Sequence, residues 1–137
     1  MSNVNETYYV NVWVKQTHPN ALVYHRMRVG RGSSYTGVER YYPDKIFIED
    51  GVVYVLEAKI KPVSSAIGQL LLYNKLFPDT PEFFFAKDFP RKMIMLTALN
   101  NDIIEGMAKD HNIEYIVWRP AFIEEELAKR TGMTGRD

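Results

Sequence analysis

The sequence predicts an α/β fold in which a mixed central β-sheet is flanked by helices. The first half of the chain consists of apolar, β-branched segments separated by turn signals, whereas the second half alternates helical and extended patterns. The length of 137 residues fits one domain with a single core. We therefore expect one domain over residues 1–137, with loose chain at residues 1–7 and 131–137.

Residues 8–15 alternate in polarity and are rich in aromatic and β-branched side chains, which predicts a strand. A turn signal at residues 18–20 leads to a predicted returning strand at residues 22–29. Glycines and serines interrupt residues 30–43, which carry no sustained period and therefore predict a loop. The chain is thus expected to open with two strands.

A second hairpin is predicted around Asp50-Gly51, a dipeptide strongly favoured in two-residue hairpin turns. Its strands are expected at residues 44–49 and 52–60. In this register Asp44 lies opposite Glu57, and opposed residues have Cβ atoms about 4.5–5.5 Å apart. Because strand side chains alternate between faces, Asp44, Glu57 and Lys59 share one face. That face also carries the apolar residues Ile46, Ile48, Val53 and Val55.

The second half of the chain predicts helices and buried strands in alternation. Pro62 ends the hairpin, and Ser64 or Ser65 can cap a helix that runs to about residue 77, before Pro78. The nearly continuous apolar run at residues 92–99 is typical of a strand buried on both faces. The remaining pattern predicts a helix at 101–111, a strand at 114–118 and a helix at 121–130.

Composition excludes several classes of site. The chain has no cysteine, which excludes disulfides, thiolate zinc sites, cysteine-ligated iron–sulfur clusters and a cysteine nucleophile. No apolar run has the length needed to cross a bilayer, and the first residues lack the pattern of a signal peptide. We therefore expect an intracellular, cytoplasmic location.

Charge is unevenly distributed although the net charge is zero. Residues 25–45 carry two acidic and five basic residues, the latter being Arg26, Arg28, Arg31, Arg40 and Lys45. Residues 101–126 carry seven acidic and two basic residues. The basic segment can face phosphates while the acidic one faces water. The alternative is two solvated surfaces of opposite sign.

The opposed acids Asp44 and Glu57 need a positive partner. Carboxylates this close repel each other, and burial strengthens the repulsion. A hard divalent cation relieves it, because Mg²⁺ typically takes one or two carboxylates together with waters and substrate phosphate. The ammonium of Lys59 compensates in part. The alternative is a salt-bridged cluster in which Lys59 neutralises one acid and water solvates the other.

The predicted helix that follows adds Gln69 and Tyr73, which are four residues apart and share one helix face. Three leucines separate them, and a glutamine in such apolar surroundings needs a partner if it is buried. Packed against the hairpin, Gln69 can reach a substrate phosphate or an attacking water. The alternative is a half-exposed polar residue near the helix start.

Together these residues resemble the PD-(D/E)xK nuclease superfamily. Pro43-Asp44 is similar to its first half-motif, Glu57-Ala58-Lys59 to its second, and Gln69 to Tyr73 to the Q-x-x-x-Y signature of its RecB-like branch. The resemblance covers about residues 43–77. It implies a restriction-endonuclease-like core and a Mg²⁺-dependent DNA nuclease, for which Mn²⁺ substitutes. We expect an endonuclease, with no iron–sulfur cluster.

The resemblance also implies roles for individual residues. Asp44, Glu57 and the backbone carbonyl of Ala58 would bind the metal. Lys59 would position and help deprotonate the attacking water or stabilise charge on the phosphate. Gln69 would orient the substrate or water, and Tyr73 would brace the helix or touch the DNA backbone. The basic residues Arg26, Arg28, Arg31 and Arg40 would contact phosphates.

One expected feature of the superfamily is not predicted in this sequence. Its core usually opens with a helix that bears a further acidic residue, whereas this chain is predicted to open with strands. Glu39 is the first candidate for that acid and Glu6 the second. The alternative for Glu39 is a loop charge paired with Arg40.

Several interpretations remain open. A single small chain offers one cleavage centre, so cutting both DNA strands at one place predicts a homodimer. A four-way-junction resolvase, a restriction-type endonuclease and an end-processing exonuclease all fit the pattern. The main alternative is a noncatalytic nuclease-fold module for DNA binding or assembly. A further alternative is an interaction protein that uses Phe83, Phe84 and Phe85, which otherwise belong to the core.

Overall fold

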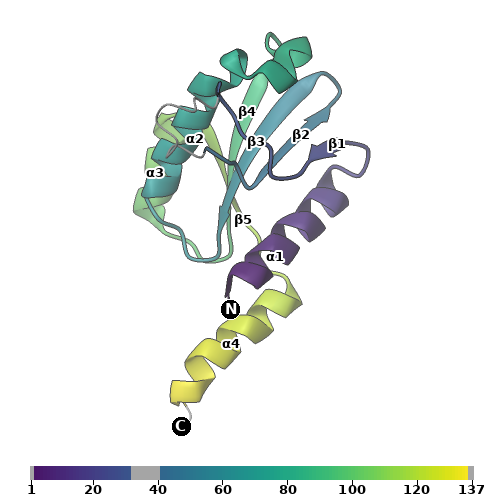
Figure 1. Ribbon diagram of the computed structural model, residues 1–137. Coiled ribbons are helices and arrows are strands. Elements are labelled where there is room, and N and C mark those ends of the chain that lie inside the picture. The colour runs from purple at the N-terminus through teal and green to yellow at the C-terminus, as the bar shows by residue number, and fades with distance from the viewer. Residues whose placement is uncertain (1, 32–40, 136–137) are drawn as a thin grey trace.

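The structure, a computed structural model, describes the backbone of residues 2–31 and 41–135 and the side chains of residues 6–31 and 41–129. In this part of the chain, five strands form one mixed sheet in the order β1-β2-β3-β4-β5 (Figure 1). The strands are β1 (Leu22–Tyr24), β2 (Lys45–Glu49), β3 (Val52–Lys59), β4 (Arg91–Thr97) and β5 (Ile113–Val117). β1, β2 and β3 pair antiparallel, whereas β3, β4 and β5 pair parallel.

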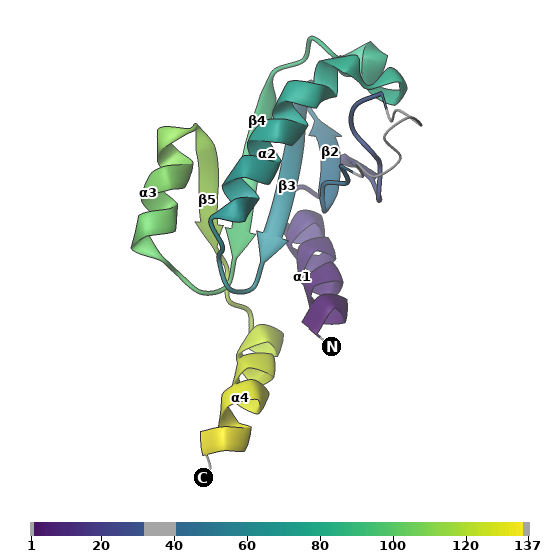
Figure 2. The same cartoon turned by 60° about the vertical axis from the view of Figure 1, so that its left-hand side comes forward.

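Helices cover both faces of the sheet, as the α/β prediction requires (Figures 1 and 2). The helices are α1 (Ser2–Thr17), α2 (Ser65–Leu76), α3 (Asp102–Asp110) and α4 (Ala121–Gly135), with the short 3-10 helices η1 (Phe77–Asp79) and η2 (Pro81–Ala86) after α2. α2 and α3 bury one face of the sheet, and α1 buries the other. α4 begins beside α1, where Ile123 joins the core, and then extends away from the sheet. No described helix has both the length and the apolar character to cross a membrane.

The β2–β3 hairpin has the predicted register. Glu49 pairs with Val52 and Lys45 with Leu56, with Asp50 and Gly51 as the two turn residues. Both turn residues have positive φ, 54° for Asp50 and 75° for Gly51, as a type I′ turn requires. This turn matches the twist of the flanking strands and fixes their register. The open end of the hairpin, where Asp44 precedes β2, is fixed with it.

The predicted strand at residues 8–15 is wrong, because these residues belong to α1. The core-facing side chains Tyr9, Val10, Trp13 and Val14 are spaced as one face of a helix, and they pack on the sheet beside Phe47. The short sequence fits both periods, and its β-branched residues favour a strand locally. Packing against the sheet decides for the helix. The chain therefore opens with a helix.

The predicted strand at residues 22–29 is shorter than expected. β1 ends at Tyr24, and Arg26 has a φ of 54°, which no strand residue adopts. The predicted loop at residues 30–43 lies partly outside the described residues. The later elements are confirmed, with α2, β4, α3 and β5 all close to their predicted bounds. α1 and α4 extend over residues 2–7 and 131–135, where we expected loose chain.

Candidate active site

The candidate site lies at the open end of the β2–β3 hairpin. Glu57 and Lys59 occupy the end of β3, and alternation puts them on the face of Val55, which α2 covers. Asp44 lies directly before β2, and its Oδ2 accepts a 2.7 Å hydrogen bond from the backbone N–H of Ala58. The carboxylate of Glu57 in turn accepts from the backbone N–H of Asp44. Backbone groups of each strand thus hold the acid of the other.

Glu57 is an unusual buried acid. Only 4% of its surface is exposed, and its Oε1 has no hydrogen-bond partner among the described residues. Burial, followed by the negative charge of Asp44, raises the pKa of Glu57 to about 8, although Lys59 opposes this shift. An orphan carboxylate oxygen beside a second acid is what a cation would satisfy. The residues present therefore fit a divalent metal ion.

Asp44 is exposed as a residue and lines a pocket. Partial desolvation of its carboxyl group raises the pKa of Asp44, against the opposing effects of the Ala58 N–H and the Lys59 ammonium. Within the described residues, no group of three or more His, Asp or Glu side chains is arranged to hold a metal ion. A cation at this site would thus rest on two carboxylates and complete its shell with waters and substrate oxygens, as Mg²⁺ usually does.

Lys59 provides positive charge without closing the cluster. The side chain is half-buried and lowers the pKa of both Asp44 and Glu57. None of the ion pairs between described side chains includes Lys59. Its ammonium is close enough to act on both acids electrostatically and is not engaged in a direct salt bridge. This differs from the alternative in which Lys59 simply neutralises one acid.

α2 supplies Tyr73 and Gln69 from the covering helix. Tyr73 is buried, and its hydroxyl donates a 3.4 Å hydrogen bond to the carbonyl of Tyr42, just before Pro43-Asp44. Burial raises the pKa of Tyr73, and Glu57 adds to the shift, which places the phenol beside the acids. Gln69 lies one turn earlier, and its Oε1 is buried without a partner among the described residues. Tyr73 thus contacts the site, and Gln69 carries an unused acceptor.

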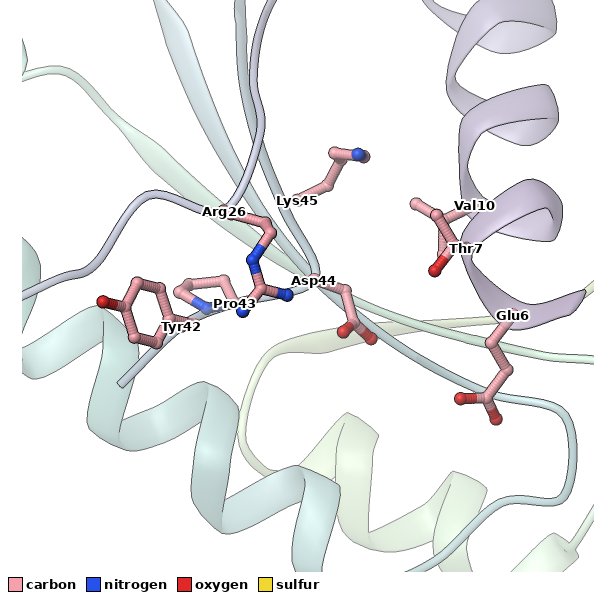
Figure 3. Close-up of a pocket in the computed structure, with 8 residues that line it drawn as sticks. All are labelled: Glu6, Thr7, Val10, Arg26, Tyr42, Pro43, Asp44 and Lys45. Carbon is pink, nitrogen blue, oxygen red and sulfur yellow. The ribbon is translucent and has the colours of Figure 1, made fainter. Parts of the chain in front are cut away.

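α1 supplies a third acid. Glu6 accepts a 3.2 Å hydrogen bond at its Oε2 from the backbone N–H of Ile60, and its charge raises the pKa of Asp44 and Glu57. Figure 3 shows Glu6 and Asp44 facing one another across the same pocket. Our first candidate for a further acid, Glu39, lies outside the described residues. Glu6 was the second candidate in the sequence analysis.

The pocket has a volume of about 290 Å³ and lies between α1 and the segment before β2 (Figure 3). Its lining comprises Glu6, Thr7 and Val10 of α1 together with Arg26, Tyr42, Pro43, Asp44 and Lys45. The guanidinium of Arg26 lies 5.6 Å from the ring centre of Tyr42, next to Asp44. The φ of 54° at Arg26 is costly for a non-glycine residue, and such strain concentrates at functional sites.

Arg28 and Arg31, which were also predicted to contact phosphates, do not line the pocket. Arg28 is half-buried, and its Nε has no partner among the described residues. Arg31 is exposed, and Arg40 lies outside the described part of the chain. Of the three arginines of this set that the structure describes, Arg26 is the one that lines the pocket beside Asp44.

The sequence analysis assigned no role to His25 and counted Lys45 only among the basic residues of segment 25–45. Lys45 is 5% exposed, and its Nζ lies 2.8 Å from Nδ1 of His25. Burial lowers the pKa of Lys45, and the nearby Asp44 opposes that shift. Alternation along the strand puts Lys45 on the opposite face from Asp44, and no sequence pattern indicates its contact with His25.

Taken together, two acids (Glu6 and Asp44) and two cationic side chains (Arg26 and Lys45) line one pocket at the end of the hairpin, and Glu57 and Lys59 interact electrostatically with Asp44 from the α2 side. Such a set can hold a divalent cation and bind phosphate oxygens beside it. The sequence matches no protein-family model and no curated protein. Function is therefore inferred from the site itself and from the motifs that form it.

Proposed function

We propose that this protein is a metal-dependent DNA nuclease of the PD-(D/E)xK type, an endonuclease, built on a restriction-endonuclease-like core. The observation that carries the proposal is the buried Oε1 of Glu57, which has no hydrogen-bond partner among the described residues and lies in a carboxylate close to Asp44 and Lys59. A fold that needed Glu57 only for stability would pair or solvate its carboxylate. A cation would supply the missing positive charge.

The opening helix gives further support. The resemblance to the superfamily implies a helix with an additional acid ahead of the hairpin, and α1 carries Glu6 at the rim of the same pocket. Tyr73 of the Q-x-x-x-Y pair lies beside Glu57, which is consistent with that resemblance.

In the proposed mechanism, Asp44, Glu57 and the backbone carbonyl of Ala58 would hold Mg²⁺, and Glu6, which lines the same pocket as Asp44, would be the further acid. When bound, Mg²⁺ would supply positive charge that neutralises the phosphate and increases the acidity of water at the site. Lys59 positions the attacking water and stabilises negative charge as it develops on the phosphate. Gln69 orients the water or a phosphate oxygen, and Arg26 binds the DNA backbone beside Asp44.

A twofold homodimer follows from the proposal if both strands are cut at one locus, because each chain has one cleavage centre. The substrate is therefore tested in three forms: linear duplex, four-way junction and single-stranded DNA. Each is end-labelled and incubated with Mg²⁺, Mn²⁺ or chelator. We expect cleavage that requires the divalent ion. Comparison of the junction with the linear duplex separates a structure-specific nuclease from one that acts on any duplex.

The variants Asp44→Asn, Glu57→Gln and Lys59→Met test the residues directly. Each is expected to lower the cleavage rate by roughly 10²–10³-fold or more, the range for loss of one electrostatic catalytic group. Glu49→Gln, which neutralises an acid at the other end of the same hairpin, is the matched control and should cleave at the normal rate. Full cleavage by Asp44→Asn and Lys59→Met would disprove the mechanism. DNA binding with no cleavage by the wild-type protein would favour the noncatalytic module.

A further inference from the structure

Lys45 is a buried ammonium with an unusual partner. Its Nζ lies 2.8 Å from Nδ1 of His25, a group that cannot neutralise it, and no ion pair among the described side chains includes it. An ammonium has only donors, so Nδ1 of His25 must act as the acceptor, which puts the imidazole proton on Nε2. Buried lysines are normally paired with an acid. Lys45 therefore has positive charge available for a ligand.

The register of the hairpin determines the face of the sheet on which Lys45 lies. Lys45 pairs with Leu56, which belongs to the core beneath α1, whereas Glu57 and Lys59 lie on the α2 side. Asp44 lies between them, because it precedes Lys45 at the very end of the strand. The open end of the hairpin thus presents Glu57 and Lys59 on one side and Lys45 on the other.

Lys45 and Asp44 both line the pocket. Lys45, Asp44 and Arg26 form one wall, and the α1 residues Glu6 and Val10 face them (Figure 3). The two cationic groups of this wall are held in place independently: Lys45 by His25, and Arg26 by the ring of Tyr42. A ligand in this pocket would meet two fixed positive charges directly beside the acids.

We propose that Lys45, with Arg26 beside it, binds a backbone phosphate of the nucleic acid adjacent to the one that is cleaved. This inference rests on the proposed function, because it takes the scissile phosphate to lie at Asp44 and Glu57. Lysine is suited to such a contact as a point charge that accepts any phosphate orientation. His25 acts as a positioning residue that aims the ammonium and leaves its charge intact. The subsite binds backbone and does not read bases.

The test measures DNA binding in chelator, so that cleavage plays no part in the result. Fluorescence anisotropy of a labelled duplex is recorded from 50 to 200 mM salt for the wild type, Lys45→Met, Lys45→Arg and Lys109→Met. Lys109 is the matched control, since it is an exposed lysine of α3 paired with Glu105 on the other side of the sheet. Loss of one phosphate contact should reduce the slope of log K against log salt by about 0.9.

We expect Lys45→Met to weaken binding by about tenfold at the lowest salt, in line with loss of one charge-assisted hydrogen bond, and to reduce the slope. Lys45→Arg should retain the slope, and Lys109→Met should match the wild type. Equal affinities and slopes for the wild type and Lys45→Met would overturn the proposal and leave Lys45 as a structural contact of His25. So would a wild-type protein that binds no DNA.

Two measurements keep this result separate from the nuclease proposal. Removing a buried charge should not unfold the protein, and thermal melting of Lys45→Met checks this. If that variant does unfold, His25→Ala replaces it, because this exposed residue aims the ammonium and its loss should weaken binding by a smaller factor. A protein that binds DNA through Lys45 but never cleaves it would refute the nuclease proposal alone.

Discussion

The acidic side chains at the two ends of the β2–β3 hairpin differ in their partners. At the turn end, Oε1 of Glu49 lies 2.6 Å from Nδ1 of His18, and the ring of His18 lies 4.8 Å from the ring centres of both Phe47 and Tyr54. At the open end, Asp44 and Glu57 act on each other, and an oxygen of Glu57 has no partner among the described residues. One acid is balanced within the fold, and the other pair is not.

This difference separates structure from function along a single pair of strands. A carboxylate matched with a base and packed against aromatic rings stabilises the fold by itself. Opposed carboxylates with raised pKa values cost stability until a ligand supplies positive charge, and such costs are typical of functional sites. The comparison predicts that changes at the open end affect the response to pH and metal, whereas changes at the turn end affect stability alone.

The largest effect expected on stability is its dependence on pH. Burial raises the pKa of Glu57 to about 8 in the folded protein, whereas the value of the free side chain is 4.5, so the folded state holds the proton more tightly. Stability is therefore full below pH 4.5 for this group and falls as pH rises towards 8. Each pKa unit of difference corresponds to about 1.4 kcal/mol, so we expect a loss of a few kcal/mol. Urea unfolding in chelator from pH 5 to 9 measures it.

Glu57→Gln should remove this part of the pH dependence and make the protein more stable than the wild type at pH 8. Mg²⁺ should stabilise the wild type more at pH 8 than at pH 5, because it competes with the proton for the acids. Glu49→Gln is the control and should leave the Glu57 contribution in place. An identical dependence of stability on pH for Glu57→Gln and the wild type would show that the fold does not raise the pKa of Glu57.

A smaller effect is expected at the turn end. His18→Gln removes the contact with Glu49 and the ring contacts with Phe47 and Tyr54. We expect a loss of about 1–3 kcal/mol, the range for a hydrogen bond to a charged group, measured by urea unfolding at pH 7. DNA cleavage under native conditions should be unchanged. A His18→Gln protein that is stable but does not cleave DNA would show that the turn end contributes to activity, which contradicts the comparison.

The sequence predicted the open end well because its geometry is local. Once Asp50-Gly51 sets a two-residue turn, the register follows, and alternation assigns Glu57 and Lys59 to one face without reference to the rest of the fold. Tyr73 and Gln69 followed from a helix with clear ends. These predictions depend on short spacings and backbone geometry alone.

The parts that were missed depend on contacts between distant segments. Residues 8–15 fit both a strand and a helix, and only packing on the sheet selects α1. Glu6 of α1 was only the second candidate for a further acid, and it lines the pocket together with Asp44. The contact of Lys45 in β2 with His25, the residue that follows β1, spans 20 residues of sequence and has no signature in either segment. Such contacts appear only when the fold is known.

The smallest effect tests whether the turn alone fixes the open end. Gly51 has a φ of 75°, and a Cβ built there meets no atom within 4 Å, so Gly51→Ala would be strained in its backbone and free of clashes. We expect a loss of about 1 kcal/mol. Gly68→Ala is the matched control of opposite sign, because Gly68 lies in α2 with equally open space and should gain about 1 kcal/mol. Urea unfolding of both variants measures the pair.

Cleavage by Gly51→Ala should stay normal despite the strained turn. A register shift of one residue would exchange side chains packed under α2, such as Ile46 and Val55, with side chains packed under α1, such as Phe47, and the mismatch in both cores costs far more than the turn can recover. The apolar face and the turn therefore specify the same pairing, and weakening one leaves Asp44 opposite Glu57. Loss of activity in a folded Gly51→Ala protein would mean that the turn alone aligns the acids, and the two ends of the hairpin could no longer be treated as independent.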